Sequence, residues 1–399
     1  MNPFKKIFIR THQTIIRFFA IFFKVPKPVI LRSYKEIASI LLLKGKTKPL
    51  QVIGKNVAKI EAISFLLKDL ENNQIKYTVF SDFVSNPTIS NINNGKKIFI
   101  KNFCNAIVAI GGGSSIDVAK AIGALLKNPR KNLIKLKGLF KVHHKLPLLV
   151  ALPTTCGSGS EASIVSVIID EKTNKKFEII DFHLVPKYAV IDSIFLKDLP
   201  KNILAYSAMD ALTHAIESYI SRSSNKETRK YSENAVKLIC GNILEAYSSL
   251  DNMDARTNLL RGSFLAGIAF TNAYVGYVHA LAHAIGAIYN LNHGYTCAII
   301  LPIILNESLD KCYKKLSQIA QLIPIDGLSD DEMSNAKLLI SYIENLNSIL
   351  EIPSRIKIDD KDVDEIALRA YKEAVPFYPV PKLFSQMELK NIILDKIKE

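Results

Sequence analysis

Three histidines lie within fifteen residues of the sequence, at positions 279, 283 and 293, although the chain has only eight histidines in all. His279 and His283 are four residues apart on a helical pattern, so both side chains face the same side of the expected helix. The letters YNLNHG then interrupt the pattern, and we expect His293 to fold back from a loop. Such residues can bind a metal, transfer protons or pack in a core, and a single helical histidine among alanines and leucines usually does the last.

An aspartate and a fourth histidine share a second apolar helical pattern, AMDALTHAIESY. Asp210 and His214 are four residues apart, so both side chains can reach one point. Taken alone, such a pair is more often a hydrogen bond than a metal site. The apolar neighbours, however, mean that a charged Asp210 needs a cation or a strong donor to justify its burial. Because this aspartate and four of the eight histidines fall within 84 residues, we favour a shared metal site.

The cysteines bear on which metal such a site would hold. The chain has five of them, without a CxxC motif or paired spacing: Cys104, Cys156, Cys240, Cys297 and Cys312. This distribution argues against a disulfide framework and against a thiolate zinc site, and it fits a reducing cytoplasm. The expected donors are nitrogen and oxygen, which suit Fe(II), Zn(II), Mn(II) or Co(II). Three or four protein ligands leave a coordination position open, as a catalytic Lewis acid requires.

A glycine-rich turn, AIGGGSSIDVAK, follows a nearly apolar strand pattern, NAIVAI. Gly111, Gly112 and Gly113 let backbone N–H groups approach a ligand closely, because glycine has no Cβ. Ser114 then opens a helix whose first turn carries Asp117, and the positive end of that helix favours a pyrophosphate. The order is not GxGxxG, so a tight turn without a ligand is the alternative.

Two more loops that follow strand patterns are rich in small and hydroxyl residues. The first, SNPT, contains Asn86 and Pro87, and the second, LPTTCGSGSE, contains Thr154 and Thr155. Each loop alone is ordinary turn chemistry. Three such loops at the carboxyl ends of strands are more easily explained by a bound nucleotide than by chance.

The elements that must position these residues change in character along the chain. After residue 25, short apolar runs alternate with helical patterns, which is typical of βαβ units with a parallel sheet. From about residue 196, long helical patterns follow one another with little strand signal. We therefore predict an α/β nucleotide-binding domain over residues 26–194 and an all-helical metal-binding domain over residues 195–399, packed tightly with a cleft between them.

The first 25 residues mix basic residues with phenylalanine and isoleucine. Arg17 interrupts the apolar run, which is far shorter than the ~20 residues of a membrane span, and no cleavage site follows. Two interpretations remain open: an amphipathic helix packed on this protein or on a partner subunit, and a basic helix lying on a membrane surface.

The net charge of +15 comes from 52 basic and 37 acidic residues. Lysines occur along the whole chain instead of collecting in one block, and no nucleic-acid-binding motif is present. We therefore expect no nucleic-acid partner.

With these motifs in one order, the sequence from about Pro26 onward resembles the iron-containing, or group III, alcohol dehydrogenases. The resemblance implies a dehydroquinate synthase-like architecture, in which a Rossmann-like parallel sheet precedes an all-α metal-binding domain. It implies four metal ligands, at Asp210, His214, His279 and His293. It implies dinucleotide contacts at Gly54, Asn86, Pro87, Gly111, Gly112, Gly113, Ser114, Asp117, Thr154, Thr155 and Lys176.

The remaining roles also follow from the resemblance. His283 matches a residue near the nicotinamide and the substrate, which leaves it available for proton transfer, and Phe270 matches a substrate-pocket position. The implied enzyme interconverts an alcohol and an aldehyde by hydride transfer, using NAD(P)(H) and Fe(II) or Zn(II). A cytoplasmic homodimer is expected. The alternatives are a metal-binding or filament-forming relative without turnover, and a membrane-surface protein anchored by residues 1–25.

The sequence departs from the family pattern at two places. Gly54, followed by Lys55, stands where the family commonly has an aspartate for the adenosine ribose. Losing that carboxylate removes repulsion against a 2′-phosphate, so we expect NADP(H) to be preferred over NAD(H). The segment Val375–Lys382 stands where many relatives have an Asn-Pro-Arg type loop, so the identity of the alcohol cannot be carried over.

Overall fold

The computed structural model describes residues 2–20, 25–173 and 175–399, except for the side chains of residues 3 and 15–20. The chain divides into two compact units. The α/β unit comprises Val25–Leu199 and Leu250–Phe264. The helical unit comprises Met1–Lys24, Pro200–Ser249 and Leu265–Glu399.

This division differs in detail from the predicted domains, which placed residues 250–264 in the helical domain. That segment clusters with the α/β unit. Its Arg256 is fully buried and donates a hydrogen bond to the carbonyl oxygen of Leu196. Thr257 Oγ1 donates to Ser193 Oγ at 2.8 Å. These contacts tie the segment to the α/β unit.

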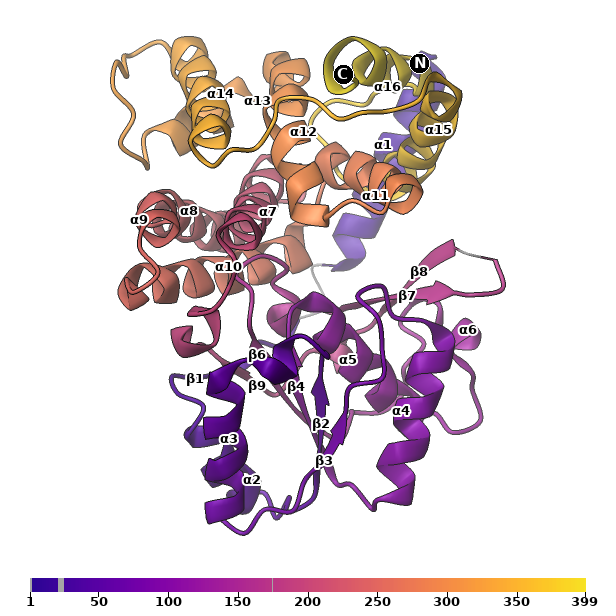
Figure 1. Cartoon of the computed structure of the whole chain (residues 1–399). Helices are drawn as coiled ribbons and strands as arrows, with labels where there is room; N and C mark the ends of the chain where they lie inside the picture. Colours follow the sequence, from indigo (N-terminus) through magenta and orange to yellow (C-terminus); the bar gives the residue numbers. More distant parts are fainter. Residues whose placement is uncertain (1, 21–24, 174) are drawn as a thin grey trace. The chain divides into compact units, whose positions relative to one another are not determined.

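A six-stranded parallel sheet forms the centre of the α/β unit, in the order β1-β9-β6-β4-β2-β3 (Figure 1). Its strands are β1 (Val29–Leu31), β2 (Pro49–Ile53), β3 (Thr78–Phe80), β4 (Ala106–Gly111), β6 (Leu148–Pro153) and β9 (Tyr188–Val190). The helices that cover it are α2 (Glu36–Leu43), α3 (Glu61–Asn72), α4 (Ile89–Lys101) and α5 (Gly113–Lys127).

The apolar sequence of β4 follows from burial on both faces. Ile107 and Ala109 belong to the core shared with α4 and α5, whereas Val108 and Ile110 belong to the core shared with α2 and α3. Successive side chains of a strand point to opposite faces, so a strand covered on both sides needs no polar positions. The predicted parallel sheet is confirmed, with a strand at NAIVAI.

A second sheet of three strands, in the order β5-β8-β7, lies in the same unit. Its strands are β5 (Gly138–Leu139), β7 (Val165–Asp170) and β8 (Lys175–Ile180), and β7 pairs with β8 antiparallel. The unit also contains α6 (Leu133–Leu136) and the short helices η1 (Val57–Lys59), η2 (Ser160–Ala162), η3 (Phe182–Leu184) and η4 (Ser193–Leu196).

The helical unit is built around α7 (Lys201–Ile220), whose residues from Ala208 to Ile220 are all buried. Helix α7 packs on α8 (Lys226–Cys240) and α12 (His293–Glu307), and α11 (Tyr277–Tyr289) packs on α12 and α15 (Asp360–Phe377). The other helices are α9 (Ile243–Ser248), α13 (Leu309–Ala320), α14 (Glu332–Ile349), α16 (Gln386–Ile392) and the π-helix η5 (Ile393–Ile397). Helix α10 (Met253–Ala273) begins in the α/β unit and ends in the helical unit.

The N-terminal segment forms α1 (Pro3–Ala20), which packs against α15 (Figure 1). The guanidinium of Arg10 donates to the carbonyl oxygen of Val380 at 2.7 Å, and the amide of Gln13 donates to that of Tyr378 at 2.8 Å. Ile9 is buried on the same side. The contacts explain why this segment clusters with the helical unit, whereas residues 1–25 were predicted as an extension outside the two domains.

The other face of α1 carries exposed apolar side chains. Phe4, Ile7 and Phe8 are exposed by 82%, 64% and 74%. Residues 21–24, which the sequence analysis included in the amphipathic segment, lie outside the described residues.

Within the described residues, no single helix is long and apolar enough to cross a membrane. Helices α10 and α11 pass that test when taken together, with a bend of 103° between them.

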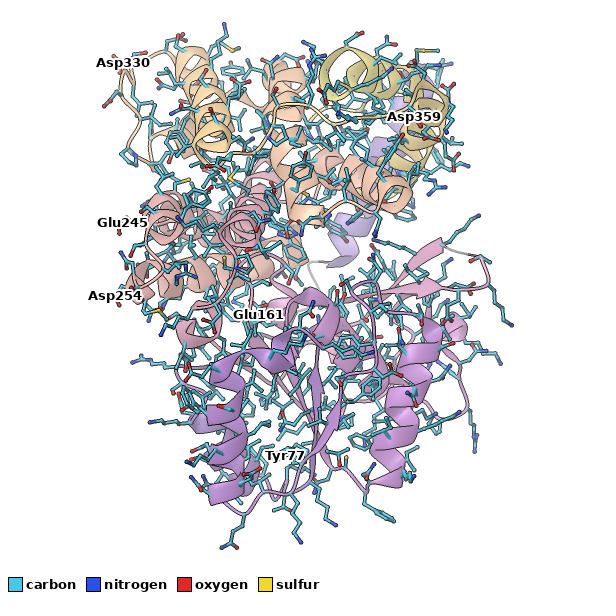
Figure 2. All side chains as sticks on the ribbon, in the orientation of Figure 1. Tyr77, Glu161, Glu245, Asp254, Asp330 and Asp359 are labelled. Atoms are coloured by element: carbon cyan, nitrogen blue, oxygen red, sulfur yellow. The ribbon has the colours of Figure 1, made fainter. Side chains whose placement is uncertain are left out.

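Most carboxylates lie at the surface, as Glu245, Asp254, Asp330 and Asp359 do (Figure 2). Glu161 is different, because its side chain is only 1% exposed. Burying an ionised carboxylate costs free energy unless the group is paired or becomes protonated.

Candidate functional site

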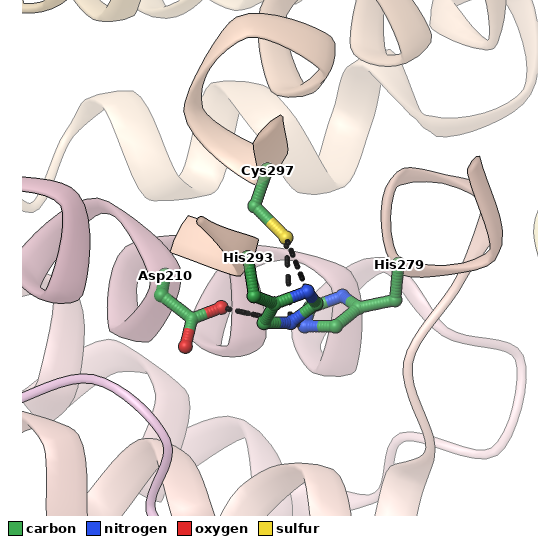
Figure 3. A group of neighbouring side chains, drawn as sticks. All are labelled: Asp210, His279, His293 and Cys297. Atoms are coloured by element: carbon green, nitrogen blue, oxygen red, sulfur yellow. Dashed lines mark hydrogen bonds and ion pairs between the residues drawn. The ribbon is translucent and has the colours of Figure 1, made fainter. Parts of the chain in front are cut away.

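Four side chains from three helices bring their donor atoms together in the helical unit (Figure 3). Asp210 comes from α7, His279 from α11, and both His293 and Cys297 come from α12. One atom of each lies within 4.8 Å of the others. Asp210 Oδ1 is 3.4 Å from His293 Nε2 and 3.8 Å from His279 Nε2.

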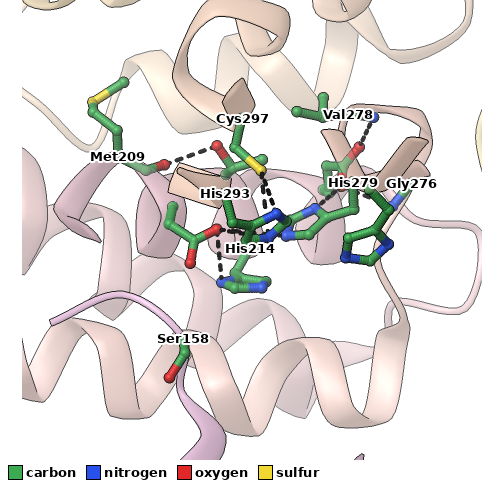
Figure 4. A network of polar contacts seen from close by, with 12 residues as sticks. Ser158, Met209, His214, Gly276, Val278, His279, His293 and Cys297 are labelled. Carbon is green, nitrogen blue, oxygen red and sulfur yellow. Dashed lines mark hydrogen bonds and ion pairs between the residues drawn. The ribbon is translucent and has the colours of Figure 1, made fainter. Parts of the chain in front are cut away.

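His214 lies one helical turn after Asp210 and completes the predicted ligand set (Figure 4). Its Nδ1 is 4.0 Å from Asp210 Oδ1, and its ring centroid is 4.4 Å from that of His279. Phe270 also stacks on the His214 ring, at a centroid distance of 4.4 Å. The structure therefore brings together all four residues predicted as ligands, with the predicted pocket residue beside them.

The link between α11 and α12 determines where His293 lies. Asn290, which follows the last residue of α11, adopts the left-handed conformation with φ of 52°. Asn292 then caps α12 by accepting a hydrogen bond from Tyr295 N. His293 is therefore the first residue of a helix, whereas the sequence analysis placed it in a loop. An added Cβ at Gly294 would collide with the carbonyl of Tyr206 on α7, so glycine lets α12 approach α7 closely.

Glu217, two turns after Asp210 on α7, orients His279. Its Oε2 is 2.6 Å from His279 Nδ1, and it accepts backbone N–H bonds from Gly276 and Val278 at 2.8 Å each. A carboxylate at Nδ1 holds the proton on that nitrogen, so the lone pair of Nε2 faces Asp210. Sequence reasoning missed Glu217, although its spacing of seven from Asp210 placed it on the same helical face.

Burial shifts the pKa of four groups at this site. It raises the pKa of Asp210 to about 7 and that of Glu217 to about 7, and it lowers the pKa of His279 to about 3. Burial also keeps the pKa of the Cys297 thiol well above its usual value. In each case removal from water disfavours the charged form. Among the described residues, Cys297 and His283 favour the ionised form of Asp210, but burial outweighs both.

Two buried atoms in this group test whether a metal fits it. Asp210 Oδ1 and His279 Nε2 are both buried, and neither has a hydrogen-bond partner within the described part of the chain. Leaving a buried polar atom unsatisfied costs about 1 to 3 kcal/mol. A divalent cation coordinated by both atoms would remove that cost and offset the carboxylate charge. The residues therefore fit a metal ion with nitrogen and oxygen donors.

His283 is held by a different carboxylate. Its Nδ1 is 2.7 Å from Glu373 Oε1, which also accepts a hydrogen bond from Tyr378 Oη at 2.8 Å. Its ring stacks on His293 at a centroid distance of 5.0 Å. With its side chain 30% exposed, His283 is far more accessible than His279, at 2%. Neither Glu373 nor Tyr378 was identified from the sequence, because about ninety residues separate them from His283.

The predicted nucleotide loops lie at the carboxyl ends of adjacent strands in the α/β unit. Gly54 follows β2, the glycine turn follows β4, and Thr154 and Thr155 follow β6. The N–H of Thr154 donates to the carbonyl of Gly111 at 3.1 Å. Gly111 has φ of +143°, and an added Cβ there would collide with Ser115, so this position requires glycine.

Other predicted cofactor residues make contacts within the unit. The partly buried Asp117 carboxylate accepts hydrogen bonds from Ser160 Oγ at 2.7 Å and from the N–H of Val167 at 3.0 Å. Ser114 Oγ donates to the carbonyl of Ser85. Asp117 thus holds the loop that follows β6, and Ser114 holds the loop that contains Asn86 and Pro87.

The carbonyl of Pro87 in turn accepts the N–H of Ile169, at 2.8 Å, which ties the same loop to β7. Lys176 lies on β8, in the smaller sheet, with an exposed side chain.

Comparisons with known proteins agree on one family. Residues 30–193 match the family described as iron-containing alcohol dehydrogenase, and residues 204–397 match the C-terminal part of the same family. The chain is 34% identical to 1,3-propanediol dehydrogenase of Citrobacter freundii, covering 88% of this chain and 91% of that one. It is 31% identical to lactaldehyde reductase of Escherichia coli K12, covering 82% and 86%.

Solved structures give the same result. The fold is similar to that of a 1,3-propanediol oxidoreductase, with a TM-score of 0.89 and 31% identity, covering 93% of this chain and 99% of that one. An alcohol dehydrogenase from Oenococcus oeni is equally similar, with a TM-score of 0.89 and 30% identity, covering 94% and 100%.

Proposed function

Because the chain belongs to the iron-containing alcohol dehydrogenase family, we propose that it interconverts a small alcohol and its aldehyde at a metal centre formed by Asp210, His214, His279 and His293. The observation that carries the metal assignment is the pair of buried, unsatisfied atoms, Asp210 Oδ1 and His279 Nε2. The alternative of a relative without turnover has no support, since the similar proteins bear dehydrogenase and reductase names.

When bound, the metal supplies a Lewis acid that polarises the substrate oxygen, and the dinucleotide supplies or accepts the hydride. Asp210 contributes the negative charge of the ligand set. Glu217 fixes the tautomer and orientation of His279 through the 2.6 Å contact at Nδ1. These residues hold the donors in place before substrate arrives, so little reorganisation is needed during the reaction.

We assign proton transfer to His283. Its Nδ1 is engaged by Glu373, so Nε2 is the atom that exchanges a proton with the substrate oxygen. Tyr378 orients Glu373 through the hydrogen bond from its hydroxyl. The greater exposure of His283 compared with His279 supports this division of roles. Phe270, stacked on His214, is positioned to form an apolar wall beside the metal site.

For the cofactor we propose NADP(H) over NAD(H). Support comes from Gly54, which offers no carboxylate to a ribose, and from the neighbouring Lys55. The Lys55 ammonium pairs with Asp82 at 3.3 Å, and both side chains are largely exposed, so a 2′-phosphate can compete for this lysine. The relatives include both an NADPH-dependent butanol dehydrogenase and an NAD-dependent methanol dehydrogenase. Membership of the family therefore does not decide between NADP(H) and NAD(H).

A cytoplasmic homodimer is part of the proposal. All five cysteines are free and buried, which is compatible with a reducing compartment. Light scattering after size-exclusion chromatography tests the dimer, and a monomer at micromolar concentration would contradict it.

The proposed activity is tested with a panel of short-chain alcohols and aldehydes, assayed with NADH and NADPH after loading with Fe(II) or Zn(II). We expect reduction of at least one aldehyde and oxidation of the corresponding alcohol. The matched control is Asp210→Asn, which keeps the size of the side chain but removes its charge. A metal-loaded protein that binds the dinucleotide without turning over any member of the panel contradicts the proposal.

A further inference from the structure

Cys297 lies one helical turn after His293 on α12, and its thiol faces the same group of donor atoms (Figure 3). We propose that Cys297 is a direct ligand of the metal, so that this centre combines oxygen, nitrogen and sulfur donors. The inference rests on the proposed metal centre and extends it, because the sequence analysis expected donors without sulfur.

The spacing of the atoms is that of a coordination shell. Cys297 Sγ is 3.6 Å from His293 Nε2, and Asp210 Oδ1 is 3.4 Å from the same nitrogen. Neighbouring donors around a tetrahedral ion are separated by about 1.6 times the metal–donor distance, or about 3.4 to 3.6 Å for oxygen, nitrogen and sulfur donors. The sulfur lies 0.2 Å farther from this nitrogen than Asp210 Oδ1 does. Sγ is also 3.9 Å from His293 Nδ1, so it lies beside the imidazole ring, and an ion bound to Nε2 reaches it once that ring turns.

The helix geometry and the burial of Cys297 determine the direction in which its thiol points. His293 and Cys297 are four residues apart on one helix, so both side chains project from the same face. Gly294, between them, lets that face approach α7, which carries Asp210. Cys297 is fully buried, so its sulfur cannot turn outward to solvent.

A second observation points to a ligand at this position. Asp210 Oδ1 and His279 Nε2 belong to the same group, and both are buried without a hydrogen-bond partner within the described residues. A cation coordinated by both atoms lies among the four donors, next to Sγ. Metal binding deprotonates a coordinating thiol, so the thiol proton leaves to solvent and the sulfur lone pair forms the metal–sulfur bond.

A thiolate ligand changes which metal the centre prefers. Sulfur is a softer donor than carboxylate oxygen or imidazole nitrogen, and it favours Zn(II) and Co(II) over Mn(II) and Fe(II). We therefore expect Cys297→Ser to weaken Zn(II) binding by at least about tenfold, the scale on which a single supporting group affects metal affinity.

The test is spectroscopic and does not depend on turnover. The Co(II)-loaded wild type should show a thiolate-to-Co(II) charge-transfer band in the near ultraviolet, and Cys297→Ser should lose it. The matched control is Cys312→Ser, which removes another buried thiol of the helical unit, one bonded to the carbonyl of Ser308, and which should keep the band.

X-ray absorption of the Zn(II)-loaded wild type provides a measurement without any variant. One sulfur at about 2.3 Å, with the remaining donors at about 2.0 to 2.1 Å, supports the inference. Stoichiometric metal with only nitrogen and oxygen donors overturns it and leaves the proposed function intact. A wild type that retains no metal after gel filtration overturns both.

Discussion

His279 and His283 are one helical turn apart on α11, yet different carboxylates hold them. Glu217 binds Nδ1 of His279 inside the core, and Glu373 binds Nδ1 of His283 where the side chain is partly exposed. Helical spacing alone made the two residues equal candidates for metal binding. Their environments in the structure distinguish the two roles. The buried His279 directs Nε2 at Asp210, whereas His283 does not belong to the group of donors formed by Asp210, His279, His293 and Cys297.

Replacing the histidines one at a time should show which of them bind the metal and which one transfers protons. His279→Ala and His293→Ala should lose metal, measured after gel filtration, because each removes a donor. His283→Ala should keep metal and dinucleotide but lose turnover by about 10²-fold, the lower range for a proton-transfer group. The exposed His144→Ala is the control and should change neither property. Near-stoichiometric metal in His279→Ala together with metal loss in His283→Ala would reverse the assignment.

Cofactor preference depends on one residue at the end of β2. A Cβ at Gly54 would lie 3.6 Å from Ser115 Oγ and 3.7 Å from Val57 Cγ2, which are ordinary contact distances, so a larger residue fits. Gly54→Asp should shift the ratio of kcat/KM with NADH to kcat/KM with NADPH toward NADH, by on the order of 1 to 2 kcal/mol. The new carboxylate would accept hydrogen bonds from the ribose hydroxyls of NADH and would repel the 2′-phosphate of NADPH. Lys55→Ala should lower kcat/KM with NADPH only. A wild type that prefers NADH contradicts this account.

Glu161 shows how burial couples charge to stability. Its Oε1 is buried without a hydrogen-bond partner within the described part of the chain, and burial raises its pKa from the usual 4.5 to about 7. The folded protein therefore keeps a proton that the unfolded chain has already lost. It follows that the free energy of unfolding falls as pH rises from about 4.5 to about 7, by a few kcal/mol.

Glu161→Gln should make that decline smaller, because glutamine does not titrate, whereas Asp210 and Glu217, whose pKa values burial also raises, still contribute to it. Urea unfolding of the wild type and the variant at pH 5 and pH 8 measures the difference in slope. The control is Glu61→Gln, an exposed position on α3, which should keep the slope of the wild type. Identical pH dependence in the wild type and Glu161→Gln would show that folding does not raise the pKa of Glu161.

At the scale of elements, α1 is held to the C-terminal part of the helical unit by backbone acceptors. Arg10 donates to the carbonyls of Val380 and Pro381, and Gln13 donates to those of Val375 and Tyr378. Through its hydroxyl, Tyr378 also orients Glu373, the partner of His283. The helix therefore supports a segment that positions the proposed proton-transfer group.

Removing these contacts should destabilise the helical unit. We expect Arg10→Ala combined with Gln13→Ala to lower the free energy of unfolding by about 1 to 3 kcal/mol, since the guanidinium is partly exposed and its hydrogen bonds are partly screened. Urea unfolding measures the effect, with the exposed Thr11→Ala as the control. Deleting residues 1–24 should cost at least as much.

A membrane role for α1 predicts a different outcome. The exposed Phe4, Ile7 and Phe8 would enter an anionic bilayer, and the deletion would abolish binding to vesicles that contain phosphatidylserine without lowering stability. Co-sedimentation of the full-length and truncated proteins with such vesicles distinguishes the two interpretations.

The elements themselves were largely predictable from the sequence. The apolar run of β4 and the long periodic patterns of α7 and α11 follow from local rules of burial and spacing. The unit to which the first part of α10 belongs was not predictable, because α10 is one uninterrupted helix and its pattern does not reveal the burial of Arg256.

For the candidate site, sequence spacing found the residues within each helix but not the contacts between distant segments. Asp210 with His214, and His279 with His283, are pairs on single helices. Glu373 meets His283 only through the packing of α15 on α11, which no local pattern encodes. Cys297 was set aside because it lacks a CxxC partner, although its spacing of four from His293 was readable in the sequence.

For the whole molecule, the family matches cover both units, since they span residues 30–193 and 204–397. The N-terminal helix lies outside both matches, so its contacts are features of this chain that family membership does not explain. The predicted nucleotide loops belong to the α/β unit, and the proposed metal donors belong to the helical unit.

The most direct test of that account is turnover measured against metal occupancy in the same samples. Metal-free wild type is titrated with Fe(II) or Zn(II), and the rate of NADPH-dependent aldehyde reduction is recorded with the bound metal per chain. We predict a rate that is zero without metal, rises in proportion to occupancy and reaches its maximum at one ion per chain, with Asp210→Asn inactive throughout. Full turnover in the chelated, metal-free protein would contradict the central claim.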